Sequence, residues 1–327
     1  MPAFSTHYIF AKEMIEELKQ KADFKLNENA VLIGTQGPDI FFFHRVFPWQ
    51  VGKSLRKVGS ALHRAKAGEI IDDFYNYCFS LTDSLDISVA KSYVYGFILH
   101  YALDRNCHPY IFKIQDEITE KHKGENPHSA HNTVEFALDS LLIKEKLKID
   151  NPLSFNTADT LNFTVYEKQQ IAKVIESCGK TVSYKMNIND IETAIDDLKY
   201  SQQMMSNVTK GQFKTICLLE KMASPVTKNF KVSSMFRTND LENAKKYVNI
   251  GNDKWISPYE SKIRNESFFD LFEFSEKDAL NMIDGFNKGL SGEEITHNIS
   301  FLTGVEVKWK LYQVSKLTTI FLQKEFT

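Results

Sequence analysis

The feature that most constrains the fold is the segment from Ile87 to Leu103, which is apolar on almost every side. A helix without a polar face is a buried helix. Near its end, His100 and Asp104 lie four residues apart and therefore share one face. An ionised aspartate in such a place costs free energy unless a positive charge meets it. We therefore expect a central helix that carries polar chemistry into the core.

The same spacing recurs in the following residues. His108 lies four residues after Asp104, just before Pro109, which is expected to end the helix. After a charged linker, His131 and Glu135 lie four residues apart on a second expected helix. Two buried pairs of histidine and carboxylate at this spacing predict a metal site. Imidazole and carboxylate ligands without thiolate are typical of catalytic rather than structural zinc.

Three further candidates precede the central helix: His7 at the start of a helix expected over residues 8–21, Asp39 after a Gly-Pro turn, and His63. Each candidate alone has an ordinary explanation, because most histidines on apolar helices are satisfied core residues. The combination favours a metal site. Eight of the nine histidines lie at or before His131, which indicates one chemistry in the first part of the chain.

Composition excludes several classes of protein. The 327 residues, 43% of them hydrophobic, are ample for a large core. The net charge of −2 argues mildly against a nucleic-acid partner, and no apolar run has the length of a transmembrane segment. No signal peptide is visible at the start, and the four cysteines form no CxxC pair. They indicate reduced thiols, so a cytoplasmic protein is expected.

Helical periodicity continues to the end of the chain, so the expected fold class is all-α, a multi-helix fold with the metal site between buried helices. Further helices are expected over residues 67–81, 164–178, 189–219, 267–286 and 292–302, and short strands only over 230–232 and 305–311. A break at Asn151-Pro152 divides a catalytic core, 1–150, from a helical remainder, 151–327, packed on it as one compact unit. Neither a Rossmann glycine fingerprint nor a nucleophile elbow is present.

A cluster of aromatic residues between residues 41 and 49 leaves two interpretations open. It is either a loop that caps the core or an apolar rim that contacts a lipid. The residues of that rim would be Phe41, Phe42, Phe43, Phe47 and Trp49.

The sequence resembles the zinc-dependent phospholipase C family, all-helical bacterial enzymes related to single-strand-specific nucleases with three zinc ions. The resemblance covers roughly residues 1 to 145. It rests on Thr6-His7, Gly37-Pro38-Asp39, Leu62-His63, the run Gly96…His100…Asp104…His108-Pro109, and His131…Glu135.

The resemblance implies roles for these residues. The aspartate at the place of Asp104 bridges two zinc ions in that family. The histidines at the places of His63 and His100 complete one of these ions, and the histidine at the place of His7 helps to hold its partner. The aspartate matching Asp39 lies at the metal pair as a ligand and a proposed base.

Another zinc ion of the family takes the residues that match His108, His131 and Glu135. One departure concerns the first residue: secreted members begin with a tryptophan whose amine and carbonyl bind zinc, whereas this chain begins Met1-Pro2. A weakened or absent third ion is therefore expected. His128 is a rival for one ligand position, although an exposed loop residue is the favoured interpretation.

The resemblance thus implies a zinc-dependent phosphodiester hydrolase of the phospholipase C type, with two or three zinc ions and a phospholipid or related phosphoester as substrate. A metal-activated water is the expected nucleophile, and Asp39 its expected base. Two alternatives stay open: a single-strand nuclease or nucleotidase on the same metal site, and a metal-binding protein without catalysis. Nucleic acid is the less favoured substrate.

Overall fold

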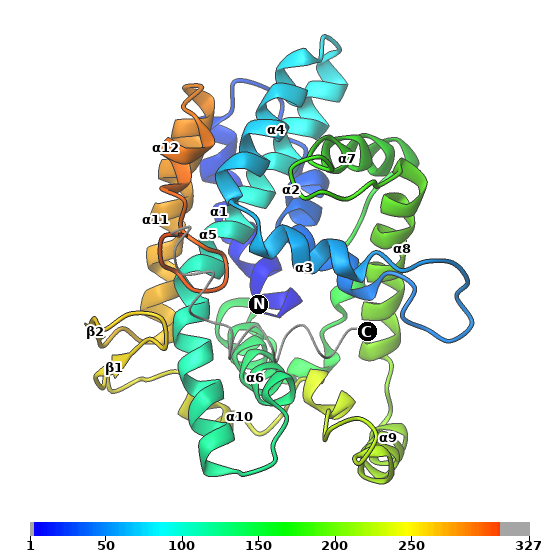
Figure 1. The fold of residues 1–327 in the computed structure, drawn as a ribbon, viewed down its shortest axis with the longest axis vertical. Coiled ribbons are helices and arrows are strands. Elements are labelled where there is room, and N and C mark those ends of the chain that lie inside the picture. Colours follow the sequence, from blue (N-terminus) through cyan, green and yellow to red (C-terminus); the bar gives the residue numbers. More distant parts are fainter. Residues whose placement is uncertain (1–2, 308–327) are drawn as a thin grey trace.

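The computed structural model describes residues 3–307, and within this range the prediction of an all-α fold is confirmed (Figure 1). The α-helices are α1 (Phe4–Lys21), α2 (Glu28–Gly34), α3 (Arg56–Arg64), α4 (Ala67–Ser80), α5 (Ser84–Lys121), α6 (Pro127–Leu147), α7 (Val165–Ser177), α8 (Ile188–Ser206), α9 (Lys210–Ala223), α10 (Leu241–Ala244), α11 (Phe268–Asn287) and α12 (Gly292–Thr296). Short 3-10 helices are η1 (Gly37–Phe43), η2 (Pro152–Ser154), η3 (Thr157–Thr160), η4 (Val232–Met235) and η5 (Lys245–Tyr247). The strands β1 (Trp255–Ile256) and β2 (Ile263–Arg264) pair antiparallel.

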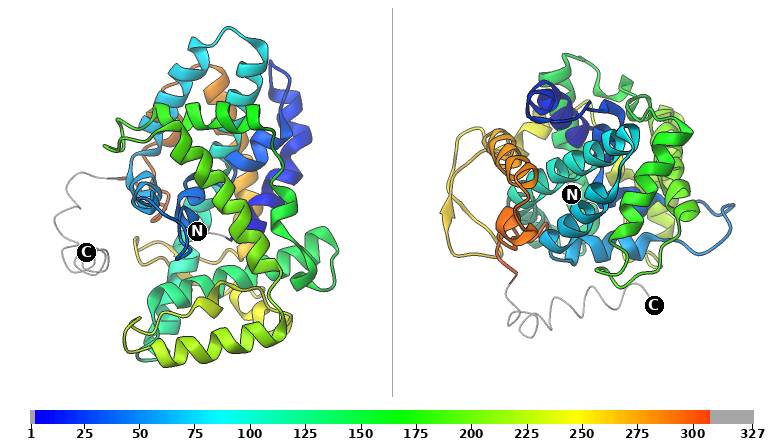
Figure 2. Two further views of the ribbon diagram at one scale, coloured as in Figure 1. Left: turned by 90° about the vertical axis from the view of Figure 1, so that its right-hand side faces the viewer. Right: turned by 90° about the horizontal axis from the view of Figure 1, so that it is seen from above.

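Helix α5 forms the centre of the fold, as its apolar sequence predicts. Its N-cap residue is Asp83, whose side chain accepts hydrogen bonds from the backbone N–H groups of Leu85 and Asp86. The helix packs against α2, α6 and α11. Seen from above, the cyan helices lie in the middle of the molecule, with α1, the green helices α7 and α8, and α11 around them (Figure 2). The polar residues of α5 are therefore surrounded by protein.

The prediction that Pro109 ends this helix is wrong, because α5 continues through it. Proline removes one backbone N–H, so the carbonyl of Arg105 loses its helical partner. The turn at Gly304, with φ of +65°, packs against this point: a Cβ there would lie 2.5 Å from Cγ of Pro109 and 2.6 Å from the Arg105 carbonyl oxygen. Beyond the proline, Tyr110 and Ile111 are buried. Their packing keeps the next turns helical.

The helix expected over residues 189–219 is two helices, α8 and α9. The chain leaves the helical path at Asn207, and Thr209 then begins α9 with a capping box, in which its side chain and that of Gln212 each bind the other's backbone N–H. Local capping therefore divides a stretch whose hydrophobic period is continuous.

The strand predicted over residues 230–232 is wrong, since Val232 begins η4. Of the strand predicted over 305–311, Glu306 forms one isolated antiparallel bridge with Ile299, and residues 308–311 lie outside the described residues. The hairpin of β1 and β2 was not predicted, because each strand has two residues and shows no alternating pattern.

Helices α2 and α5 cross at two glycines. A Cβ on Gly96 would lie 2.2 Å from the carbonyl oxygen of Val31 and 2.8 Å from Cα of Gly34, and a Cβ on Gly34 would lie 2.2 Å from the carbonyl oxygen of Tyr93. No side chain fits at either position. This close approach brings the end of α2 onto the turn of α5 that precedes His100.

The hydrophobic core extends across residue 150. Phe272 of α11 meets Phe10 of α1 edge to face at 5.1 Å between ring centroids, and Phe286 packs near Tyr95 of α5 at 6.3 Å. The later helices therefore pack directly on the elements that carry the candidate site. The division into 1–150 and 151–327 stays a prediction.

Candidate metal centre

The eight candidate ligands come from five elements that meet in the interior. His7 lies on α1, Asp39 on η1, His63 on α3, and the others on α5 and α6. Within the described residues they form three groups that could each hold a metal ion: His7, Asp39 and His100; His63, His100 and Asp104; and His108, His131 and Glu135. Every one of these side chains is buried except His131, which is half-buried. Elements far apart in the sequence thus meet at the positions that the resemblance indicated.

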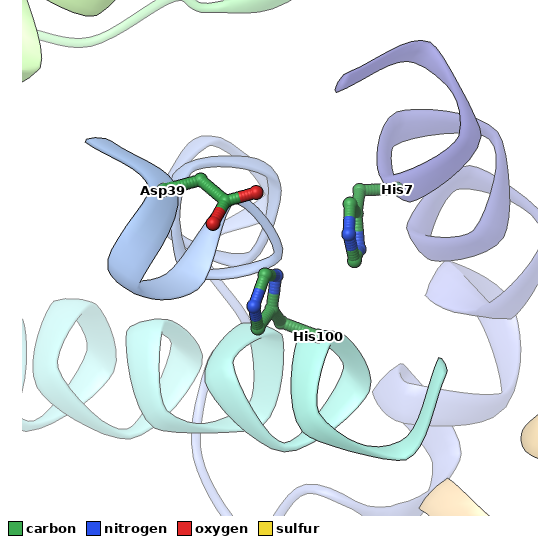
Figure 3. A group of neighbouring side chains, drawn as sticks. All are labelled: His7, Asp39 and His100. Carbon is green, nitrogen blue, oxygen red and sulfur yellow. The ribbon is translucent and has the colours of Figure 1, made fainter. Parts of the chain in front are cut away.

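The first group is drawn in Figure 3, where His7, Asp39 and His100 point toward one another from α1, η1 and α5. The rings of His7 and His100 stack at 4.3 Å between centroids. Asp39 also faces His63, with its Oδ1 3.2 Å from Nε2 of that residue. Asp39 therefore belongs to the first group and also contacts His63 of the second group.

Asp104 lies where several histidines converge. Its Oδ1 is 3.4 Å from Nε2 of His7, and its Oδ2 is 3.2 Å from Nε2 of His100 and 3.7 Å from Nε2 of His63. The two carboxylate oxygens thus face different histidines. This arrangement suits a carboxylate shared by two ions.

The third group lies further along α5 and joins it to α6. Nε2 of His131 is 2.8 Å from Oε1 of Glu135, one turn later on the same helix. The His108 ring lies 5.8 Å from the His131 ring between centroids. His128 is exposed in the first turn of α6 and belongs to none of the three groups.

Local backbone structure explains how η1 and α1 reach the site. Gly37 has φ of +50°, and a Cβ there would lie 2.5 Å from the His100 ring, so only glycine allows η1 to pass so close. The first turn of α1 is held by the buried Asp139 of α6, which accepts hydrogen bonds from the N–H of Thr6 at 2.6 Å and from its hydroxyl at 2.8 Å. These contacts fix the position of His7, the next residue.

Four of the histidines have Nδ1 bound to an oxygen acceptor. Nδ1 of His63 bonds the Gly59 carbonyl at 2.8 Å, and Nδ1 of His100 bonds the Thr35 carbonyl at 3.1 Å. The other two acceptors are the Phe301 carbonyl for His108, at 2.8 Å, and Oε1 of Gln115 for His131, at 3.0 Å. An Nδ1–H donor leaves Nε2 as the free lone pair, so all four rings present Nε2 to the site.

The unsatisfied polar atoms of the site test whether a metal fits. Within the described residues, Nε2 of His7, His63, His100 and His108 and both oxygens of Asp104 are buried without a hydrogen bond of normal geometry. Buried polar atoms are nearly always hydrogen-bonded, because an unmade bond costs about 1–3 kcal/mol. These lone pairs face one another, and a divalent cation between them would satisfy them. The donor set therefore fits zinc.

The pKa values follow from burial and mutual proximity. Burial by itself would raise the pKa of Asp104, but His100 and His108 hold that pKa well below its usual range. Burial lowers the pKa of His7 and of His108. Burial would also lower the pKa of His100, yet Asp104 raises it overall. Asp104 is thus ionised near neutral pH, which metal binding requires.

The comparisons with known proteins agree with this geometry. The family model for zinc-dependent phospholipase C matches residues 6–205, more than half of the chain. The chain belongs to this family. Searches of curated proteins and of solved structures found no significant match.

The zinc-dependent phospholipases C are hydrolases, and the three groups that could hold a metal ion agree with a zinc-dependent family. No helix among residues 3–307 has the length and hydrophobicity needed to cross a membrane. The predicted family and fold are thereby confirmed, whereas the role of each candidate ligand stays a prediction.

Some residues of the site were missed from the sequence. Phe301 lies outside the matched range, yet its ring packs edge to face on His63 at 5.5 Å and its carbonyl binds His108. Gln115 lies seven residues after His108 and therefore two turns along the same helix face. The expected helix end at Pro109 concealed that signal.

The residues of the possible apolar rim differ in exposure, and lipid contact by the exposed ones stays a prediction. Phe41 is buried at 1% exposure, so it cannot meet a lipid. Phe42, Phe43 and Phe47 are half-buried, and Phe42 stacks on the His63 ring at 5.6 Å. Trp49 is 63% exposed. Most of the segment thus covers the core, and its end faces solvent.

Proposed function

We propose that this member of the family is a zinc-dependent phosphodiesterase of the phospholipase C type that hydrolyses a phospholipid or a related phosphoester. The observation that carries the proposal is the set of three groups of imidazole and carboxylate side chains along α5, each of which could hold a metal ion. Membership of the family supports the same chemistry.

In this proposal each group has a distinct role. His63, His100 and Asp104 would hold one ion, and Asp104 would also contribute to a second ion together with His7. Zinc, when bound, lowers the pKa of a coordinated water and neutralises charge on the phosphoryl group. The fixed Nε2 atoms provide neutral ligands without a change of rotamer, which keeps the centre preorganised.

His108, His131 and Glu135 would hold another ion. The Phe301 carbonyl orients His108, and the Gln115 side chain orients His131. Because these two acceptors fix Nδ1–H on each ring, each histidine offers the same nitrogen throughout the reaction.

Asp39 is the proposed catalytic base. Its Oδ1 is buried without a hydrogen bond of normal geometry and lies 3.2 Å from Nε2 of His63. A carboxylate so placed can accept a proton from the attacking water on that oxygen. As the water attacks phosphorus, the bond from phosphorus to the leaving ester oxygen breaks. That oxygen takes up the proton held by Asp39 and leaves as an alcohol, and a phosphomonoester remains.

The ion held by His7 is the proposed weak member of the set. Within the described residues both ring nitrogens of His7 are buried without a hydrogen bond of normal geometry, whereas Nδ1 of each of the other four candidate histidines binds an oxygen acceptor. An acceptor of this kind orients a histidine and makes it a better metal ligand, and His7 has none. Two tight ions and a weaker third are therefore proposed.

The experiment combines elemental analysis with two activity assays on the zinc-loaded protein. We expect at least two zinc ions per chain and release of phosphorylated headgroup from phospholipid dispersed in detergent. The comparison variant is Asp39→Asn, which should lose activity by about two to four orders of magnitude while the two groups that do not include Asp39 keep their zinc. Zinc-loaded protein that cleaves single-stranded DNA and no phospholipid would favour the nuclease. Protein that takes up zinc and hydrolyses neither would favour the binding protein.

A further inference from the structure

The segment that follows Asp39 and contains the candidate ligand His63 has an unusual charge pattern. From residue 40 to residue 68 the sequence contains no aspartate or glutamate, although the whole chain has 42 of them and a net charge of −2. The same stretch contains six cationic residues: Arg45, Lys53, Arg56, Lys57, Arg64 and Lys66. Charge is therefore strongly uneven, with a local excess of positive charge beside the candidate centre.

The structure places much of this charge on one exposed projection. Residues 44–55 form the blue loop that extends to the right of α3 in Figure 1. Lys53 of this loop and Arg56 and Lys57 in the first turn of α3 are exposed, and none of them forms an ion pair within residues 3–307. The loop also carries Trp49, 63% exposed, and Val51, 86% exposed. The loop and the first turn of α3 thus combine unpaired cations with exposed apolar side chains.

The loop is held in this position by α8. Asp197 accepts hydrogen bonds from the backbone N–H of Arg45 at 2.8 Å and from the side chain of Gln50 at 2.6 Å. Asp190 pairs with the Arg45 guanidinium at 2.8 Å. Phe47 stacks under Trp49 at 4.9 Å between centroids. The exposed indole is therefore preorganised, and its presentation to solvent is a property of the folded loop.

We propose that residues 45–57 form a docking surface for an anionic phospholipid membrane. Tryptophan at the interface and lysine or arginine near negatively charged headgroups are the two contributions that hold a peripheral protein on such a surface. The proposal rests on the proposed function, since a phospholipase must reach a lipid surface. It adds the residues that make contact and the charge of the lipid.

Two observations favour a membrane over single-stranded nucleic acid. Nucleic-acid surfaces need aromatic faces on which bases stack. One face of Trp49 is already covered by Phe47, and the most exposed apolar side chain of the loop is aliphatic, Val51. An aliphatic side chain contributes to insertion between lipid headgroups and offers nothing for base stacking. The loop also joins η1 to α3, so the docked surface is covalently continuous with Asp39 and His63.

The test measures sedimentation of the full-length, zinc-loaded protein with vesicles. One set contains phosphatidylcholine alone, and the other contains equal amounts of phosphatidylcholine and phosphatidylglycerol. We expect preferential binding to the anionic set, which weakens as salt is raised. Replacing Lys53, Arg56 and Lys57 together by glutamine should reduce that binding by about fivefold for each charge. Trp49→Ala should reduce it on the order of tenfold.

The matched controls are in the hairpin of β1 and β2, which extends to the left in Figure 1, and in helix α11. Ile263→Ser removes a similarly exposed apolar side chain, 61% exposed. Replacing the exposed Lys254, Lys262 and Lys277 by glutamine removes the same charge. Both controls should bind vesicles like the parent. Equal losses in the controls and the loop variants would overturn the proposal.

A soluble substrate separates this proposal from the proposed function. Hydrolysis of bis(p-nitrophenyl) phosphate should be unchanged in Trp49→Ala, because that side chain lies outside the centre. Binding to anionic vesicles without hydrolysis of any phosphodiester would refute the enzyme and leave the docking surface standing. Hydrolysis without vesicle binding would refute the docking surface alone. Binding of single-stranded DNA that is lost in the loop variants, with no vesicle binding, would also refute it.

Discussion

Replacing Gly96 by alanine should disturb both stability and the metal centre. The new Cβ would lie 2.2 Å from the Val31 carbonyl oxygen and 2.8 Å from the backbone nitrogen of Thr35. Both contacts are with backbone, so no side chain can rotate away. Ordinary contact requires α2 and α5 to separate by roughly 1 Å, and overpacking of this kind costs about 1–3 kcal/mol.

The same shift reaches the site. The Thr35 carbonyl accepts the hydrogen bond from Nδ1 of His100 at 3.1 Å, so its displacement loosens the orientation of that ring. An unfolding entropy of about 2.1 cal/mol/K per residue gives roughly 0.7 kcal/mol/K for 327 residues. A loss of about 3 kcal/mol then lowers Tm by about 4 °C.

The assay is thermal unfolding of Gly96→Ala with zinc and with a chelator, together with zinc content. The matched control is Gly211→Ala on the exposed helix α9, where the nearest atom to a Cβ is Oγ1 of Thr209 at 4.0 Å. Alanine there should leave Tm unchanged or raise it slightly. A Gly96→Ala protein with a Tm within about 1 °C of the parent and a full zinc complement would refute the reasoning.

Three further predictions concern single side chains. Asp104→Asn should lower zinc content more than any other single ligand replacement, because it removes the charge that several histidines share; full zinc by elemental analysis would contradict this. In a chelator titration the ion held by His7 should leave first, and an N-terminal tag should leave the other ions bound; equal affinity for all ions would argue against it. Burial lowers the pKa of His44, whose Nδ1 accepts the N–H of Leu55 at 2.9 Å. Unfolded His44 takes up a proton below pH about 6.5, so stability should fall below that pH, and His44→Asn, which keeps an acceptor and does not titrate, should reduce the slope in denaturant titrations at several pH values.

The all-α class was predictable because helical periodicity continues along the chain. The central place of α5 was predictable because a helix with apolar side chains on every face must be buried. The i, i+4 pairs of His100 with Asp104 and of His131 with Glu135 were visible for the same reason, since spacing within a helix is local. The meeting of His7 with His100 depends on how α1 and α5 pack, which no local pattern contains. The family resemblance supplied that information.

The failures have physical causes of the same kind. Proline at position 109 predicts a helix end from local hydrogen bonding, but tertiary packing of Tyr110 and of the turn at Gly304 outweighs the lost bond. The acceptor for His108 comes from Phe301, 193 residues away. A backbone carbonyl has no residue type, so no sequence pattern could identify it.

The hydrogen bonds that orient the four histidines have a consequence for genetics. Three of the acceptors, on Thr35, Gly59 and Phe301, are main-chain carbonyl groups that every amino acid possesses. A substitution at one of these residues changes the side chain and retains the carbonyl acceptor if the backbone conformation is unchanged. A saturation screen for loss of zinc should therefore recover changes at Gln115, the one acceptor that belongs to a side chain. The same screen would not detect the three main-chain hydrogen bonds that orient His63, His100 and His108.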